Sequence, residues 1–152
     1  MKPEELMLGD IVMYKHQHYP TKLTEIHSHS MPFEDMNVKG WIKYGDFDDI
    51  EPIQLTPEIL KKNGWKDDNN ISDCLGIKIF AHEKKLCGVE FIDEACYSFN
   101  VYERWEDHDY DGAPIDWGYR YVTFIFNLHY IHELQHALRL CKFDELANDL
   151  KI

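Results

Sequence analysis

The chain has 152 residues, of which 44% are hydrophobic and 14% aromatic, a composition typical of a folded protein with a substantial core. Its 28 acidic and 16 basic residues give a formal net charge of −12. That charge disfavours contact with the phosphate backbone of DNA or RNA and suits a basic partner or a cation. This length predicts one compact unit, or two small lobes that share a core.

The sequence contains neither the apolar core of a signal peptide nor a run long enough to span a membrane. Its four cysteines show no Cys-x-x-Cys spacing. We therefore expect a cytoplasmic protein with reduced thiols that does not act at a membrane.

The first 52 residues predict a small β lobe. Turn residues separate short β-prone runs at Ile11–Tyr14, Lys22–His27 and Gly40–Tyr44. Short strands broken in this way suggest an SH3-like barrel.

Two His-x-His pairs fall in this lobe, His16 with His18 and His27 with His29. Residues i and i+2 share one face of a strand, so either pair could chelate a metal ion. We favour the alternative interpretation, in which they are surface histidines.

Residues 57–63 predict a short helix. Thr56 is a favourable N-cap, Pro57 suits the first helical position, and Gly64 can adopt the left-handed conformation that ends a helix. We interpret this helix as a bracket at the start of a second part, residues 53–152. That part would contain the bracket helix, an antiparallel meander and a C-terminal helix packed on the meander.

The predicted strands of the meander lie near Leu75–His82, Leu86–Ile92, Cys96–Trp105 and Tyr119–Phe126. Several alternate apolar and polar side chains, as half-buried strands do. The last strand is apolar on both faces, which predicts a central position in the sheet. Together with the helices, these strands predict an α+β fold.

The segment Tyr130–Leu140 contains His-Glu-x-x-His and also has the apolar spacing of a packing helix. In a metallohydrolase, His132 and His136 would bind zinc and Glu133 would act as general base. His129 is a candidate third ligand on the same helix face, but it lies about 10 Å from His136 along the axis. We favour a helix that packs its apolar stripe and leaves the histidines in solvent; a non-catalytic metal-binding face is a further alternative.

The acidic stretch before Gly118 resembles half of a calcium loop. Asp107, Asp109 and Asp111 followed by Gly112 give the alternate oxygen ligands and the glycine turn that calcium loops use. The EF-hand pattern then requires Glu at the twelfth position, where this chain has Gly118. We favour a turn of solvated aspartates between two strands, with calcium binding as the alternative.

Three stretches, Leu8–Val12, Asp49–Gly64 and Tyr130–Leu140, resemble a family of small proteins of gut bacteria and their phages or mobile elements. The resemblance covers both ends and the middle of the chain and covers residues 105–117 and the meander poorly. No activity is attached to that family, so the resemblance implies an accessory protein. Similar proteins can carry Gln at the position of Glu133, a replacement that a general base would not tolerate.

We therefore expect a small, non-enzymatic, cytosolic binding or accessory protein of phage or mobile-element type that acts on a protein partner. The first alternative is a zinc hydrolase that uses His132, Glu133 and His136. The second is an acidic decoy that occupies a nucleic-acid-binding protein in place of DNA. A decoy would carry clustered carboxylates and bind its basic partner in a salt-sensitive way.

Overall fold

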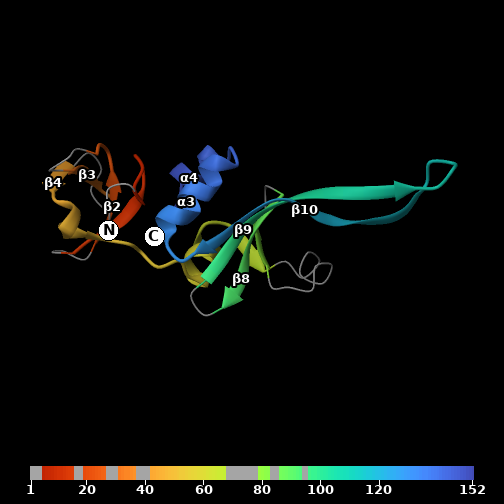
Figure 1. Cartoon of the computed structure of the whole chain (residues 1–152), viewed down its shortest axis with the longest axis horizontal. Coiled ribbons are helices and arrows are strands. Elements are labelled where there is room, and N and C mark those ends of the chain that lie inside the picture. Colours follow the sequence, from red (N-terminus) through yellow and green to blue (C-terminus); the bar gives the residue numbers. More distant parts are fainter. Residues whose placement is uncertain are drawn as a thin grey trace. The chain divides into compact units, whose positions relative to one another are not determined.

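The computed structural model describes residues 5–15, 19–26, 31–36, 42–67, 79–82, 86–93 and 96–152. These residues form a mixed α+β structure made mostly of antiparallel sheet, as the sequence predicts (Figure 1). The chain divides into two compact units: the first comprises Met1–Leu55 and His129–Ile152, and the second comprises Thr56–Leu128. The histidines of the two His-x-His pairs, His16, His18, His27 and His29, lie outside the described residues.

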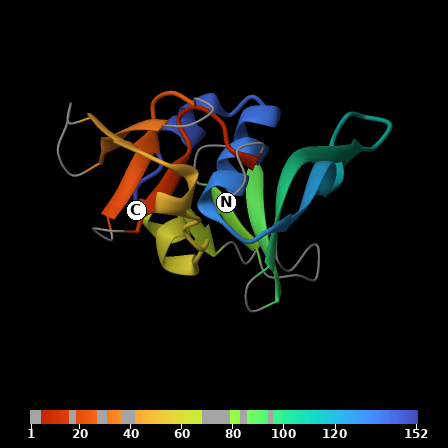
Figure 2. The same ribbon diagram turned by 60° about the vertical axis from the view of Figure 1, so that its left-hand side comes forward.

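The first unit contains a five-stranded antiparallel sheet in the order β4-β3-β2-β1-β5. Its strands are β1 (Ile11–Tyr14), β2 (Tyr19–Leu23), β3 (Met31–Asp35), β4 (Ile42–Gly45) and β5 (Ile50–Glu51). A 3-10 turn, η2 (Phe47–Asp49), precedes β5, which returns to pair with β1. Figure 2 shows this sheet from a second direction.

Among the predicted strands of this lobe, Ile11–Tyr14 is confirmed with the predicted bounds. Strand β2 begins and ends earlier than the predicted Lys22–His27, and β3 is not predicted at all. The reason for the missed strand is Pro32, which has no N–H to donate to a ladder and weakens any strand signal. The lobe closes over a core formed by Leu6, Val12, Leu23 and Ile50.

The second unit begins with the predicted bracket helix, α1 (Pro57–Lys62). Thr56 is its N-cap, with Oγ1 accepting a hydrogen bond from the Ile59 N–H at 3.4 Å. Gly64 has a φ of +82°, the left-handed conformation that the sequence predicts for the end of this helix. The helix ends one residue before the predicted Asn63, which serves as its C-cap.

A five-stranded antiparallel sheet in the order β10-β9-β8-β7-β6 follows. Its strands are β6 (Trp65–Asp67), β7 (Ile79–His82), β8 (Cys87–Asp93), β9 (Cys96–His108) and β10 (Pro114–Leu128). The meander is therefore confirmed in its described part. No cysteine in the described part of the chain forms a disulfide, and no helix there is long and apolar enough to cross a membrane.

Strand β10 is an edge strand, so the predicted central position of Tyr119–Phe126 is wrong. Its apolar residues on both faces remain partly in solvent; Val122, for example, is 57% exposed. Apolar residues on both faces favour a strand conformation, but they do not determine how many strands lie beside it in the sheet. Strands β9 and β10 also extend beyond the predicted bounds, into the acidic segment that the sequence assigned to a loop.

The C-terminal helices α3 (Ile131–Leu140) and α4 (Asp144–Asn148) belong to the first unit. This grouping replaces the predicted division after residue 52, which placed the C-terminal helix with the meander in residues 53–152. The physical reason lies in hydrogen bonds that residue spacing does not reveal. The buried Gln135 side chain accepts from the Ile11 N–H at 2.8 Å and donates to the carbonyls of Gly9 at 3.0 Å and Ala147 at 2.9 Å.

The first prediction concerns this glutamine. Gln135→Leu keeps the volume of the side chain but leaves the Ile11 N–H and two carbonyls without partners in a buried site. We expect the free energy of unfolding of the first unit to fall by about 3 kcal/mol, measured by urea unfolding followed through backbone amide resonances. The control Leu140→Gln, at a position of the same helix that is 76% exposed, should change stability by less than about 0.5 kcal/mol. Equal stability of the two variants would contradict this role of Gln135.

Candidate functional site

Helix α3 begins with a cap provided by Glu133. The residue before the helix, Tyr130, is extended, and Oε2 of Glu133 accepts from the Tyr130 N–H at 3.0 Å and the His129 N–H at 2.6 Å. These bonds satisfy N–H groups at the start of the helix, as the acidic residue of a capping box does. The carboxylate that a zinc hydrolase would need as general base therefore caps its own helix.

His136 faces the buried carboxylate of Asp10, which is 0% exposed. Nε2 of His136 lies 2.7 Å from Oδ2 of Asp10, and the Arg139 guanidinium lies 2.6 Å from Oδ1. The Met7 N–H also donates to Asp10, at 2.7 Å, so one carboxylate joins the segment before β1 to the last turns of α3.

His132 lies on the same helix, is 5% exposed, and stacks on the ring of Tyr130. The two rings are nearly parallel, at 10°, with centroids 5.8 Å apart. Burial lowers the pKa of His132, and this effect exceeds the opposing effects of Glu133 and Asp10. The imidazole is therefore neutral near pH 7, and its buried Nδ1 atom has no hydrogen-bond partner in the described part of the chain.

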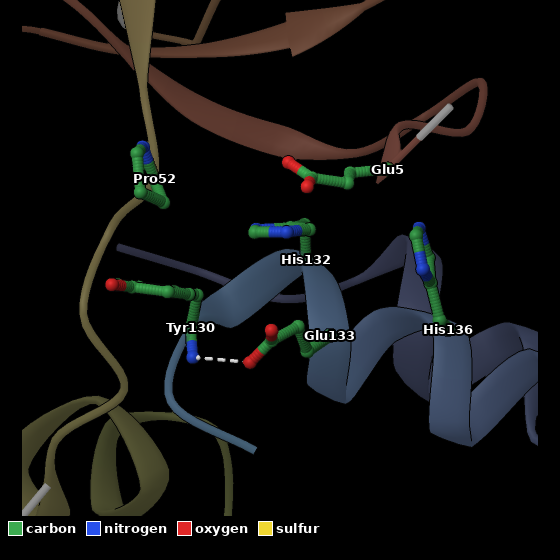
Figure 3. Close-up of a pocket in the computed structure, with 6 residues that line it drawn as sticks. All are labelled: Glu5, Pro52, Tyr130, His132, Glu133 and His136. Carbon is green, nitrogen blue, oxygen red and sulfur yellow. Dashed lines mark hydrogen bonds between the residues drawn. The ribbon is translucent and has the colours of Figure 1, made fainter. Parts of the chain in front are cut away.

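These side chains line a cavity of about 480 Å³ within the first unit. It is lined by Glu5, Pro52, Tyr130, His132, Glu133 and His136 (Figure 3). Figure 3 shows Glu5 reaching from the segment before β1 toward the side of the cavity that His132 occupies. The cavity thus brings together residues from the two ends of the chain and from the connection after β5.

The structure corrects the expectation that the polar face of this helix lies in solvent. His132 is buried and His136 is engaged with Asp10, because β1 and the segment before it cover this face. His129 precedes the helix, so it does not share a helical face with the other two, and it is absent from the cavity lining. The rings of His132 and His136 are 5.8 Å apart, so the structure brings these two predicted residues together and leaves His129 out.

The aspartates of the predicted calcium loop lie at the tip of the β9–β10 hairpin. Asp109 forms the turn, with Oδ1 accepting from the N–H groups of Asp111 at 3.0 Å and Ala113 at 2.8 Å. Asp107 lies in β9, and Gly112 has a φ of +80°. All three aspartates are exposed, which agrees with the favoured interpretation of a turn of solvated aspartates between two strands.

Residues 103–120, here called the arm, form a ribbon of only two strands. The register of β8 against β9 ends at Val101, and beyond it β9 pairs only with β10 among the described strands. Figure 1 shows the hairpin continuing past the other strands of its sheet. Directly opposite residues share a face, so Trp105 covers Gly118, where a Cβ atom would lie 2.9 Å from the indole nitrogen.

The other face of the arm carries Trp117 and Tyr119, whose rings meet edge to face with centroids 6.0 Å apart. Arg104 lies over the Trp117 ring at 5.4 Å and forms an ion pair with Glu106 at 2.7 Å. Large apolar side chains nevertheless remain exposed on the arm and just after it: Trp105, Tyr110, Ile115, Trp117, Tyr121 and Val122. Ile115, at a register irregularity, is 61% exposed and Trp117 is 50% exposed.

Sequence reasoning missed Asp10, Glu5 and Tyr130 as members of the site around His132. Asp10 stands in a predicted turn before a strand, and aspartate is a common residue in turns, so its presence there does not indicate a site. Nothing in its neighbourhood along the chain indicates a partner 126 residues away. The unusual feature is the buried charge, which becomes visible only in the folded chain.

Among the described residues, no group of three or more His, Cys, Asp or Glu side chains has an arrangement that could hold a metal ion. No protein family model matches the chain, and no curated protein or solved structure shows significant similarity to it. The geometry of the two regions, the cavity and the arm, is therefore the basis for any functional proposal.

The second prediction separates a capping Glu133 from a catalytic one. Glutamine retains a carbonyl oxygen that can accept from the His129 and Tyr130 N–H groups, whereas alanine cannot. We expect Glu133→Ala to lower the free energy of unfolding by about 1 kcal/mol and Glu133→Gln by less than about 0.5 kcal/mol. Urea unfolding of the first unit measures both, and an equal loss in the two variants would show that the carboxylate charge, not the cap geometry, matters.

The third prediction concerns pH. Because the pKa of His132 is lower in the folded chain than its ordinary value of about 6.5, the folded state binds fewer protons in this range than the unfolded state. Stability is then lost as the pH falls below about 6.5. Between about pH 7.5 and 5.5 the wild type should lose more unfolding free energy than His132→Gln. The control His108→Gln, an exposed histidine of the arm, should follow the wild type; a His132→Gln slope equal to the wild type would contradict the assignment.

Proposed function

We propose that this protein is a non-enzymatic binding protein that acts through protein contacts, and that the arm is its contact surface. The observation that carries the proposal is the set of exposed aromatic and aliphatic side chains on a ribbon that pairs with no third strand in the described part of the chain. Tryptophan, tyrosine and arginine are the residues that dominate the energetics of protein interfaces.

The low stability expected of an isolated two-stranded ribbon supports this proposal. A two-stranded ribbon in water is marginally stable on its own, and an open edge strand invites pairing with another chain. Here β10 is such an edge, and the side chains of Trp117 and Ile115 are at least half exposed along it. A partner that covers this surface would bury apolar area and supply backbone hydrogen bonds to the edge.

The charges of the arm favour a basic partner. The arm carries six acidic residues, Glu103, Glu106, Asp107, Asp109, Asp111 and Asp116, and two basic ones, Arg104 and Arg120. Both arginines form ion pairs within the arm, with Glu106 and Glu103. Asp107 and Asp116 stand directly opposite each other in the ladder, a like-charge arrangement that is unfavourable until a cation lies between or above them. A lysine or arginine of a partner would supply that cation.

The alternative functions rank lower for physical reasons. A hydrolase would have to release Glu133 from the helix start before that carboxylate could serve as a base. The acidic decoy is a special case of the present proposal, in which the basic partner is a nucleic-acid-binding protein. We retain it as a second candidate because of the opposed aspartates of the arm.

We further propose that the first unit is an SH3-like lobe in an accessory protein of phage or mobile-element type that works in the cytoplasm. The return of β5 to β1 after a 3-10 turn supports the SH3-like assignment. The resemblance of the chain's ends and middle to small proteins of such elements supports the accessory role. The contact surface would then belong to the second unit, with the first unit contributing its own site.

The fourth prediction tests the arm with a short soluble peptide that alternates lysine with valine. We expect it to bind the purified protein and to bind more weakly when salt rises from about 0.05 M to about 0.15 M. Trp117→Ser and Asp116→Asn should each raise the Kd by about fivefold or more, measured by fluorescence anisotropy of the labelled peptide.

Matched controls lie in the first unit, where Tyr44 and Asp48 are exposed. Tyr44→Ser and Asp48→Asn should leave the Kd unchanged, and a peptide that alternates glutamate with valine should not bind. Weakening by Asp48→Asn equal to that by Asp116→Asn would show that only the net charge matters. That result, or no binding of the lysine peptide at low salt, would overturn the arm as the contact surface.

A further inference from the structure

The cavity of the first unit combines an unpartnered buried acceptor with carboxylates and a flat aromatic wall. Its volume of about 480 Å³ lies in the range of small-ligand pockets, about 300–1,000 Å³, and far exceeds the space that a single ion needs. His132 lines it, is 5% exposed, and has a buried Nδ1 atom without a hydrogen-bond partner among the residues that the structure describes. A buried polar atom of this kind is rare in folded proteins and points to a group that the protein itself does not contain.

We propose that this cavity binds a guanidinium group, with Glu5 and His132 as hydrogen-bond acceptors and the Tyr130 ring as a stacking surface. The guanidinium could belong to a small molecule or to an arginine side chain of a peptide. This inference concerns the first unit alone and does not depend on the arm.

The donor and acceptor chemistry selects a cation that carries N–H groups. His132 is neutral near pH 7 because burial lowers its pKa, so in the tautomer with its proton on Nε2 its Nδ1 lone pair accepts a hydrogen bond. Glu5 and Glu133 add two carboxylates to the lining. A ligand that meets these groups must donate hydrogen bonds, and a positive charge increases their strength.

The ring geometry selects a planar cation over a compact one. Tyr130 and His132 stack within 10° of parallel and so present rings of one orientation to the cavity. A guanidinium is planar, lies flat on aromatic faces and directs its N–H groups outward in its own plane toward carboxylates. An ammonium group has neither property.

Two other side chains of the cavity lining have structural roles of their own. Glu133 caps the helix, and His136 is held by Asp10, which also binds Arg139. The Arg139 guanidinium faces the buried Asp10, whereas Glu5 lies on the cavity side of His132 (Figure 3). A cation in the cavity would therefore approach a carboxylate and a neutral imidazole.

The test uses the full-length protein in the presence of a chelator and compares three probes. Nα-acetyl-arginine amide carries the guanidinium on a peptide-like frame, agmatine carries it on a small molecule, and Nα-acetyl-citrulline amide is the uncharged isostere. Calorimetry should give a Kd of about 1 mM or lower for at least one guanidinium probe and a Kd at least about tenfold weaker for citrulline. Preference for the arginine amide over agmatine would identify a peptide side chain as the source.

Two variants remove the proposed acceptors. Glu5→Gln and His132→Phe should each weaken binding of the arginine probe by about fivefold or more, and the phenyl ring keeps the stacking on Tyr130. The control is Glu145→Gln, at an exposed position of α4, which should bind as the wild type does. If a variant fails to fold, the nitrogen resonances of the His132 ring in the wild type provide an independent readout, because the arginine probe should shift Nδ1 more than Nε2.

Several outcomes would overturn the proposal. Equal binding of the citrulline and arginine probes would show that no cation is recognised. No shift of the His132 nitrogens at saturating probe, or equal weakening by the control variant, would show that the probe binds elsewhere. A separate titration with zinc chloride, without chelator, tests whether the cavity binds a metal ion instead of a guanidinium. Zinc that binds more tightly than the guanidinium probes and requires both His132 and His136 would assign the cavity to a metal.

Discussion

The first unit depends on one buried carboxylate. Asp10 is fully buried, accepts a hydrogen bond from the Met7 N–H, and holds His136 and Arg139 of α3 through its two oxygens. A buried charge without partners is very unfavourable, and removing one partner of a buried pair costs about 3–5 kcal/mol. The C-terminal helix therefore has one well-defined position against β1. Gln135, which joins the same two segments through three hydrogen bonds, fixes this position further.

This arrangement changes the meaning of the His-Glu-x-x-His segment. The three residues that would form a zinc hydrolase have separate structural tasks: Glu133 caps the helix, His136 binds Asp10, and His132 stacks on Tyr130. A capping box accepts Glu or Gln at this position. What remains for a ligand is the Nδ1 atom of His132, which no described residue contacts by a hydrogen bond, and the cavity beside it.

The two units present opposite kinds of surface. The site of the first unit is concave and is built around buried polar groups, so it suits a small cationic group. The arm of the second unit is exposed on both faces and carries aromatic rings beside backbone groups that pair with no third strand among the described ones, so it suits a larger partner. Both surfaces are rich in carboxylates, as expected for a chain with a formal net charge of −12. That shared charge favours basic ligands at each of them.

Local sequence signals determined the elements themselves. Thr56, Pro57 and Gly64 define the bracket helix through short-range backbone chemistry, and the turn of aspartates before Gly112 follows from the same kind of signal. Tertiary structure alone decided which elements meet: that β10 lies at an edge, that α3 joins the first unit, and that Asp10 meets His136. The reason is physical. Capping and turn formation depend on atoms a few residues apart, whereas burial of a charge or of a polar face depends on partners more than a hundred residues away, and no local pattern encodes those.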